Sequence, residues 1–246
     1  MVKHKETIGC LCLHGFTGSP WELEPLAERL KQKYHWLVYT PVLPGHEAIE
    51  QLKEASYKNW ILKADIALQE LLNRCEKVFV IGFSMGGLLA TYLAARYQVE
   101  KLVLLGAAAE YFNAGQLMKD VVHLVEYGIK GQMKEHPYYR FLHDKIKTPV
   151  RALTQFQKLV KTITPFISTV QIPVFIGQGV EDGIVPKKSA IFIYEEMNQT
   201  IRQLHLYQES KHFLLYDKNR EQVMNDVETF LMTDIEKSTM VLKSIE

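Results

Sequence analysis

The stretch Val78-Phe79-Val80-Ile81-Gly82-Phe83-Ser84-Met85-Gly86-Gly87-Leu88-Leu89 decides the fold class of this 246-residue chain. An apolar run of β-branched and aromatic residues ends in a Gly-x-Ser-x-Gly motif, and apolar residues at helical spacing follow at once. The glycines on either side of the serine let the backbone turn sharply from a strand into a helix. The pattern predicts a nucleophile elbow with Ser84 at the junction, and an ordinary Gly/Ser turn is the alternative.

A serine hydroxyl is a weak nucleophile at neutral pH, so it needs a base and an acid that orients the base. In chains with this elbow the order is serine, acid, histidine, which restricts the search to residues after Ser84. His212 lies in a loop just after the last predicted strand, at the sheet end where the elbow should also lie. His212 is therefore the predicted base, and a surface loop histidine is the alternative. The remaining histidines after the serine fall in a helical stretch or inside a strand: His123, His136, His143 and His205.

The acid is expected in the loop after the preceding strand, within residues 178–186. Two adjacent carboxylates lie there, Glu181 and Asp182. Asp182 is favoured because a glycine follows it and lets the loop turn before the next helix. Glu181 stays open as an alternative acid. Asp217 is disfavoured because it follows His212, against the chain order.

Attack on a carbonyl creates an oxyanion, which two backbone N–H groups can stabilise. Met85 begins the helix after the serine, so its N–H is an unpaired donor at the positive end of the helix dipole. The second donor is expected from the loop Leu13–Gly18, whose glycines allow the main chain to approach and the Phe16 N–H to point inward. His14 in this loop precedes Ser84, so we expect it to brace the loop.

Strand-like and helix-like segments alternate along the chain, which predicts a parallel sheet with helices on both faces. Strands are expected at 7–13, 36–40, 77–82, 101–105, 173–177 and 202–206, and helices at 20–32, 57–75, 85–97, 187–197 and 219–235. Residues 110–168 lack a clear strand and follow a strand directly. We therefore expect a helical cap over the site, inserted in a single domain spanning 1–246; an irregular helical part of the core is the alternative. Four apolar cap positions could contact an acyl chain or only pack among helices: Leu117, Val121, Phe156 and Leu159.

Composition excludes several classes of function. The formal charge is +1 with no basic stripe, so no nucleic-acid partner is expected. No dinucleotide, phosphate or metal-ligand fingerprint occurs, and no run approaches the ~20 apolar residues that span a bilayer. We expect a cytoplasmic protein without a metal, a cofactor or integral membrane association. Cys10, Cys12 and Cys75 are expected to be small core hydrophobes in a reducing compartment.

Several of these stretches, in this order, resemble the α/β-hydrolase superfamily, and more narrowly the small bacterial carboxylesterases and monoacylglycerol lipases of Bacillus type. The stretches are Leu13–Gly18, Pro44-Gly45-His46, the elbow, Asp182 with Ser189-Ala190 downstream, and Ser210-Lys211-His212. The resemblance implies an α/β-hydrolase fold with a mostly parallel sheet of six or seven strands, a small helical cap and no cofactor. It also implies Ser84, Asp182 and His212 as a catalytic triad, with Phe16 and Met85 as oxyanion donors.

Together these features predict a serine esterase that hydrolyses a small-molecule carboxylic ester, with monoacylglycerols among the candidate substrates, through an acyl-enzyme. A thioesterase or another acyl hydrolase could use the same triad. Outside the enzymes, the fold can serve as a receptor for a small hydrophobic ligand. A receptor would not need every catalytic part. The sequence leaves the natural substrate and the oligomeric state open.

Overall fold

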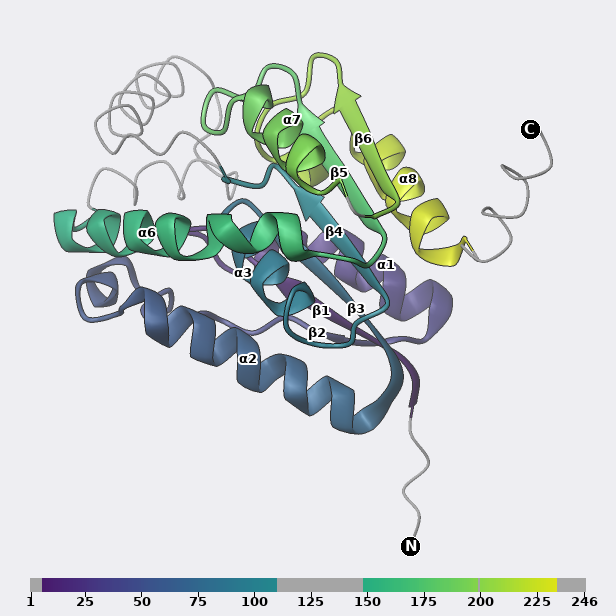
Figure 1. Cartoon of the computed structure of the whole chain (residues 1–246), viewed down its shortest axis with the longest axis horizontal. Helices are drawn as coiled ribbons and strands as arrows, with labels where there is room; N and C mark the ends of the chain where they lie inside the picture. The colour runs from purple at the N-terminus through teal and green to yellow at the C-terminus, as the bar shows by residue number, and fades with distance from the viewer. Residues whose placement is uncertain (1–5, 110–147, 199, 234–246) are drawn as a thin grey trace, which may run out of the picture.

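The computed structural model describes residues 6–109, 148–198 and 200–233. In these residues six strands form one sheet, in which every pair is parallel and the order is β2-β1-β3-β4-β5-β6 (Figure 1). The strands are β1 (Glu6–Leu13), β2 (Leu37–Tyr39), β3 (Cys75–Phe83), β4 (Lys101–Leu105), β5 (Val174–Gly179) and β6 (Arg202–Tyr207). The predicted parallel sheet is confirmed.

Helices connect the strands close to where the periodicity placed them. They are α1 (Glu24–Tyr34), α2 (Tyr57–Arg74), α3 (Met85–Ala94), α6 (Val150–Ile163), α7 (Lys187–Glu196) and α8 (Arg220–Met232), with 3-10 turns η1 (Pro20–Leu23), η2 (Ile49–Lys53), η3 (Thr164–Thr169) and η4 (Leu214–Tyr216). The helix expected over 20–32 is divided into η1 and α1. Pro25 lies in the first turn of α1, where its missing N–H costs nothing, and it cannot continue a helix from the turn before it.

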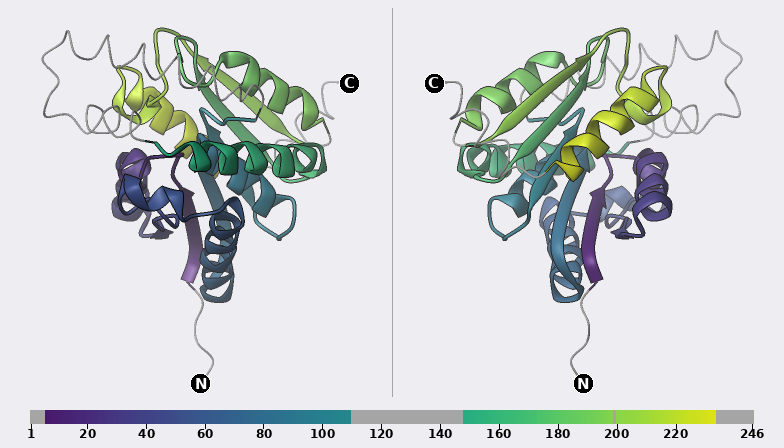
Figure 2. Two further views of the ribbon diagram at one scale, coloured as in Figure 1. Left: turned by 90° about the vertical axis from the view of Figure 1, so that its left-hand side faces the viewer. Right: turned by 90° about the vertical axis from the view of Figure 1, so that its right-hand side faces the viewer.

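The helices cover both faces of the sheet (Figures 1 and 2). Alternate side chains of each strand enter different cores. Leu11 and Val80 pack with α2, α3, α6 and α7 on one face, whereas Cys10 and Ile81 pack with α1 and α8 on the other. Helices cover the core on each face of the sheet. The sheet is therefore a rigid platform, and the loops at its carboxyl edge are the part free to carry a site.

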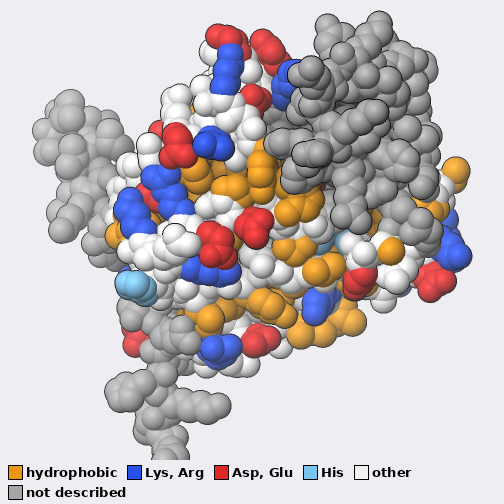
Figure 3. All heavy atoms as spheres, turned by 180° about the vertical axis from the view of Figure 1, so that it is seen from behind, with side chains coloured by type: hydrophobic (Ala, Val, Ile, Leu, Met, Phe, Trp, Pro, Cys, Tyr) orange, Lys and Arg blue, Asp and Glu red, His pale blue; other side chains and the backbone are white. Residues whose placement is uncertain are grey.

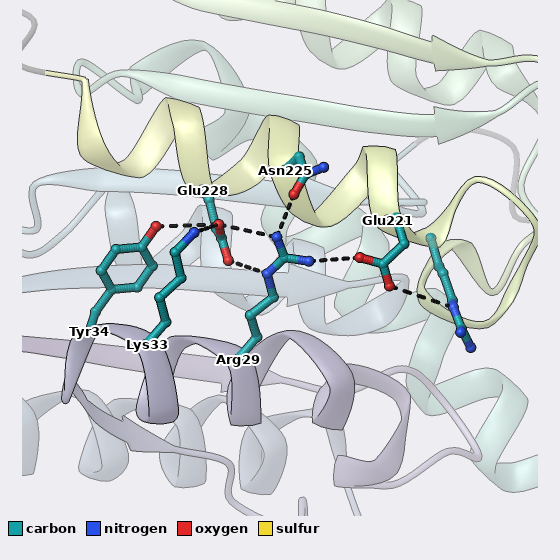
Figure 4. A network of polar contacts seen from close by, with 7 residues as sticks. Arg29, Lys33, Tyr34, Glu221, Asn225 and Glu228 are labelled. Carbon is teal, nitrogen blue, oxygen red and sulfur yellow. Dashed lines mark hydrogen bonds and ion pairs between the residues drawn. The ribbon is translucent and has the colours of Figure 1, made fainter.

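A charged network joins α1 to α8 on the second face (Figure 4). The buried carboxylate of Glu228 accepts hydrogen bonds from Arg29 and from the Lys33 ammonium, the latter at 2.7 Å. Arg29 also bonds Asn225, and it donates to Glu221 at 2.9 Å. Although burial acts to raise it, the pKa of Glu228 lies below its usual value because Lys33 and Arg29 favour the charged form. The network therefore joins α1, which follows η1, to α8, which follows η4.

The face in Figure 3, viewed from behind relative to Figure 1, carries acidic and basic side chains interspersed with apolar ones. Charges of both signs are mixed on this face, as the near-zero net charge leads one to expect. Within the described ranges, none of the helices has both the length and the apolar character needed to cross a bilayer.

The predicted cap falls mostly on residues 110–147, outside the described part of the chain, and so do Leu117 and Val121. Its last part forms α6 and η3. Helix α6 lies against α2 and α3 and buries Phe156 and Leu159 in the same core as Trp60. The division into a domain and an inserted cap stays a prediction.

Candidate active site

The serine of the elbow has a backbone conformation that side-chain-bearing residues rarely adopt. Ser84 lies between β3 and α3 with φ 53° and ψ −116°. Its N–H donates to the Leu105 carbonyl at 3.0 Å, and its carbonyl accepts from the N–H groups of Gly87 at 3.0 Å and Ala108 at 3.3 Å. Such a backbone costs on the order of 1–3 kcal/mol and persists only where surrounding contacts impose it. Here the end of β4, the segment that follows it and the first turn of α3 impose it.

Two glycines of the motif are required by close packing. A Cβ on Gly82 would lie 2.3 Å from the carbonyl oxygen of Gly86, and a Cβ on Gly86 would lie 1.9 Å from that of Leu13. Neither position can accept a side chain without a backbone shift. The start of α3 therefore presses directly on the end of β1, beside the loop that follows β1.

A carboxylate and an imidazole meet at the same edge of the sheet. Asp182 follows β5, and its Oδ2 accepts a hydrogen bond from Nδ1 of His212 at 2.7 Å and one from Nε2 of Gln178 at 2.9 Å. Its Oδ1 accepts the N–H groups of Ile184 at 2.8 Å and Val185 at 2.9 Å. All these donors hold the carboxylate in one orientation. Because Nδ1 of His212 donates to it, Nε2 is left as the acceptor of the neutral ring.

The alternative acids lie elsewhere. Glu181 is exposed to solvent. Asp217 accepts the Lys211 N–H at 2.6 Å and therefore closes the loop before His212. His205, within β6, pairs with Asp226 at 3.3 Å. Of the carboxylates considered from the sequence, Asp182 is the one that bonds His212.

Ser84 and His212 both lie at the carboxyl ends of β3 and β4. The ring centroid of His212 lies 4.8 Å from that of Phe83, the residue before the serine. A Cβ on Gly106 would lie 3.4 Å from both Cε1 and Nδ1 of His212. Gly106 follows Leu105, whose carbonyl accepts the Ser84 N–H. The imidazole thus lies over the residues that flank and hold the serine.

The loop after β1 runs beside the serine. A Cβ on Gly15 would lie 3.1 Å from Cβ of Ser84. The Phe16 ring stacks on Phe156 with centroids 5.0 Å apart and lies edge-on to Trp60 at 5.8 Å. These contacts turn the side chain of Phe16 into the core.

His14 braces this loop, as expected. Its Nδ1 donates to the Gly15 carbonyl at 2.9 Å, and its Nε2 accepts the Leu43 N–H at 3.0 Å. Both bonds require the neutral ring with its proton on Nδ1. Burial, reinforced by the charge that His46 would carry, lowers the pKa of His14 to about 3. His14 therefore stays neutral at physiological pH.

His46 lies edge-on to His14, with ring centroids 4.9 Å apart. Burial lowers the pKa of His46 to about 4, against the raising effect of bonds to the Pro44 and Leu43 carbonyls. The loop after β1 and the loop after β2 are thus joined through a pair of buried neutral rings. Protonation of either ring would place a charge in this contact.

The predicted pocket residues that are described lie in α6. Leu159 is completely buried, and Phe156 is buried against Phe16. Their assignment to an acyl pocket stays a prediction. Among the described residues there is no group of three or more His, Cys, Asp or Glu side chains that could hold a metal ion. Cys10, Cys12 and Cys75 are buried, and none of them is part of a disulfide.

Sequence reasoning missed Gln178 and Glu22. Gln178 is fully buried, and its Nε2 also donates to the carbonyls of Gly179 and Val185, each at 3.1 Å. The available signal was a polar residue near the end of an otherwise apolar strand. Glu22 contacts the loop after β1, where it accepts the Gly15 N–H.

Comparison with known proteins assigns the family. Residues 11–133 match a family model described as the alpha/beta hydrolase fold, and residues 132–219 match one described as serine aminopeptidase, S33. The first match spans half of the chain. The chain belongs to the alpha/beta hydrolase fold family, which confirms the resemblance read from the sequence.

Individual relatives share low sequence identity with this chain. The chain is 27% identical to a thermostable monoacylglycerol lipase of Bacillus sp. (strain H-257), over 88% of this chain and 87% of the relative. It is 25% identical to a carboxylesterase of Bacillus subtilis (strain 168), over 90% of this chain and 91% of the relative. Both are enzymes of the class predicted from the sequence, the carboxylic ester hydrolases.

Solved structures show the same fold. A structure from work on LipS and LipT, two metagenome-derived lipolytic enzymes, aligns with a TM-score of 0.75 at 23% identity, over 92% of this chain and 94% of that one. A monoacylglycerol lipase of Paleococcus ferrophilus aligns with a TM-score of 0.66 at 16% identity, over 91% and 94%.

The buried pair His14–His46 predicts a loss of stability in acid. Unfolded histidine binds a proton near pH 6.5, whereas folded His46 does not until about pH 4. The unfolded state therefore binds more protons between these values, and stability present at pH 7 is lost as the pH falls. We expect His46→Phe to remove about 2 kcal/mol of the pH dependence of the unfolding free energy between pH 7 and pH 5.

Urea denaturation at several pH values measures this difference. His35→Asn is the matched control, because His35 is exposed and its left-handed backbone suits asparagine. The unfolding free energy of the control should change with pH as that of the wild type does. The same pH dependence in His46→Phe would contradict the buried neutral state of His46.

Proposed function

We propose that this chain is a serine carboxylesterase that cleaves carboxylic esters through an acyl-enzyme formed on Ser84. The observation that carries the proposal is the 2.7 Å hydrogen bond from His212 to Asp182 beside a serine held at positive φ. A strained serine, an oriented imidazole and a fixed carboxylate at one sheet edge are the parts that acyl transfer requires.

In the proposed reaction Nε2 of His212 takes the proton of the Ser84 hydroxyl while Oγ attacks the ester carbonyl. The tetrahedral intermediate collapses, the C–O bond to the alcohol breaks, and the imidazolium gives its proton to the departing oxygen. Water then enters, loses a proton to His212 and attacks the acyl-enzyme. The C–O bond to Oγ of Ser84 breaks, the imidazolium returns its proton to Oγ, and the acid is released. Asp182 keeps Nδ1 protonated and stabilises the imidazolium in both halves.

The oxyanion is assigned to the backbone N–H groups of Phe16 and Met85. Met85 is the first residue of α3, so its N–H has no intrahelical acceptor and adds the positive end of the helix dipole. Gly15 passes close to Cβ of Ser84, which supports the next N–H in the chain as the second donor. Preorganised donors of this kind contribute a few kcal/mol each.

The proposed substrate is a small-molecule ester, with a monoacylglycerol as the leading example, because one curated relative is named a monoacylglycerol lipase and the other a carboxylesterase. A thioester is the second candidate, since the same triad can attack it. We assign the cytoplasm as the compartment, because none of the three buried cysteines is part of a disulfide.

Substitution of the triad tests the proposal with p-nitrophenyl acyl esters as substrates. Ser84→Ala and His212→Ala should each lower kcat by at least about a thousandfold without loss of fold. Asp182→Asn should lower kcat by at least about a hundredfold, because the wrong tautomer of His212 is then favoured.

Glu181→Gln is the matched control, since Glu181 is the exposed neighbour of Asp182. It should stay within about twofold of wild type, because an exposed side chain contributes little to the site. Loss of activity in Glu181→Gln with activity retained in Asp182→Asn would reverse the assignment. Release of one equivalent of p-nitrophenol followed by no turnover would favour the ligand receptor. A preference for acyl thioesters over matched oxygen esters would favour the thioesterase.

Gln178 provides an independent prediction. Its Nε2 donates to the same oxygen of Asp182 that accepts from His212, so its loss should leave the carboxylate less firmly oriented. We expect Gln178→Leu to lower kcat about tenfold, in line with ~1.5 kcal/mol for a hydrogen bond to a charged group. Gln178→Glu should lower it further, because it places a second carboxylate against Asp182. Equal activity of both variants and wild type would show that Gln178 does not orient Asp182.

A further inference from the structure

A glutamate lies buried beside the loop after β1. Glu22 belongs to the turn η1 and is only 3% exposed. Its Oε2 accepts the N–H of Gly15 at 2.6 Å. In the sequence, Glu22 lies in the first turn of the helix expected over 20–32. Burying a carboxylate is costly, so its place in this turn requires an explanation from its contacts.

The loop is shaped to admit this carboxyl group. A Cβ on Gly18 would lie 2.1 Å from Oε1 and 2.4 Å from Oε2 of Glu22, so any side chain at that position would collide with it. A Cβ on Gly15 would lie 3.2 Å from Oε2 of Glu22 and 3.1 Å from Cβ of Ser84. Gly15 therefore lies close to both Glu22 and the serine.

The two peptide groups that meet at Gly15 are held from different directions. Its N–H donates to Glu22, while its carbonyl accepts from Nδ1 of His14 at 2.9 Å and from the Gly18 N–H at 3.3 Å. Glycine has the widest backbone freedom of any residue. Without both anchors, these two peptide planes could rotate about the glycine.

The anchors at Gly15 also orient the next N–H. The Gly15 carbonyl and the Phe16 N–H share one planar peptide, and the described residues contain no cis peptide bond. In a trans peptide these two groups point in opposite directions. The hydrogen bond from His14 to the Gly15 carbonyl therefore directs the Phe16 N–H away from His14. The hydrogen bond from the Gly15 N–H to Glu22 fixes the orientation of the preceding peptide group, between residues 14 and 15.

The turn that carries Glu22 is itself held against the His212 loop. The Tyr216 hydroxyl donates to the Trp21 carbonyl at 2.6 Å. The Trp21 ring stacks on Phe213 with centroids 5.4 Å apart, and Phe213 follows His212 directly. Glu22 is thereby fixed relative to both sides of the site.

We propose that Glu22 is a positioning residue for the oxyanion hole, which acts through Gly15 to fix the direction of the Phe16 N–H. The inference rests on the proposed function, because it assigns the Phe16 N–H to the oxyanion. As a positioning residue, Glu22 does not touch the substrate. Its carboxyl oxygen serves as a hydrogen-bond acceptor, a role that the amide oxygen of a glutamine could also fill.

Three variants and two readouts test the proposal. Glu22→Ala removes the acceptor, Glu22→Gln keeps an oxygen at the same reach, and Glu24→Ala is the matched control at an exposed glutamate two residues on. The readouts are kcat and KM for a p-nitrophenyl ester, and Ki for a trifluoromethyl ketone with the same acyl chain. The ketone forms a tetrahedral adduct on the serine and so probes the oxyanion hole directly.

We expect Glu22→Ala to lower kcat between about tenfold and a hundredfold, with KM within about threefold and Ki raised by the same factor as kcat/KM falls. Glu22→Gln should stay within about threefold of wild type, and Glu24→Ala should be unchanged. If Glu22→Ala does not fold, Glu22→Asp serves instead, because it keeps the charge but shortens the side chain by one methylene.

Three results would overturn the inference. The first is a Glu22→Ala enzyme with the kcat and Ki of Glu24→Ala. The second is a loss of activity that Glu22→Gln shares in full, and the third is a loss that leaves Ki unchanged, since both would indicate a merely structural role. A wild-type protein that turns over no ester at all would instead defeat the proposed function.

Discussion

The structure depends on the close approach of α3 to the carboxyl end of β1. Gly86 lies so near the Leu13 carbonyl that no side chain fits between them. This approach leaves Ser84 at positive φ and brings the loop after β1 beside it. The strain is sustained by a sheet whose two faces are both closed by helices. The hydrogen bonds that His14 and Glu22 make to Gly15 lie in the loop beside this junction.

Buried polar side chains surround the proposed catalytic groups, and each serves the orientation of a neighbour. Gln178 donates to Asp182, His14 holds the Gly15 carbonyl, and Glu22 holds the Gly15 N–H. Such groups are costly to bury unless their hydrogen bonds are made, and here each makes one that fixes a loop. A site on loops gains rigidity in this way from side chains that never reach the substrate.

Much of this arrangement could be predicted from the sequence, because the relevant signals are local or topological. The elbow motif marks Ser84, and the rule that parallel strands end at one edge brings the loops of Asp182 and His212 together. Glu22 and Gln178 escaped prediction because their roles depend on which backbone group each side chain reaches. The division of the first helix at Pro25 was missed for a simpler reason, since its apolar spacing continues across the break.

The most direct measurement is to treat the native protein with a fluorophosphonate and map the adduct by tandem mass spectrometry. We expect one stoichiometric adduct on Ser84, in the tryptic peptide 78–96, with labelling slowed strongly in His212→Ala. An adduct on a different residue, or wild-type protein that stays unlabelled while correctly folded, would contradict the central claim that this serine is activated for acyl transfer.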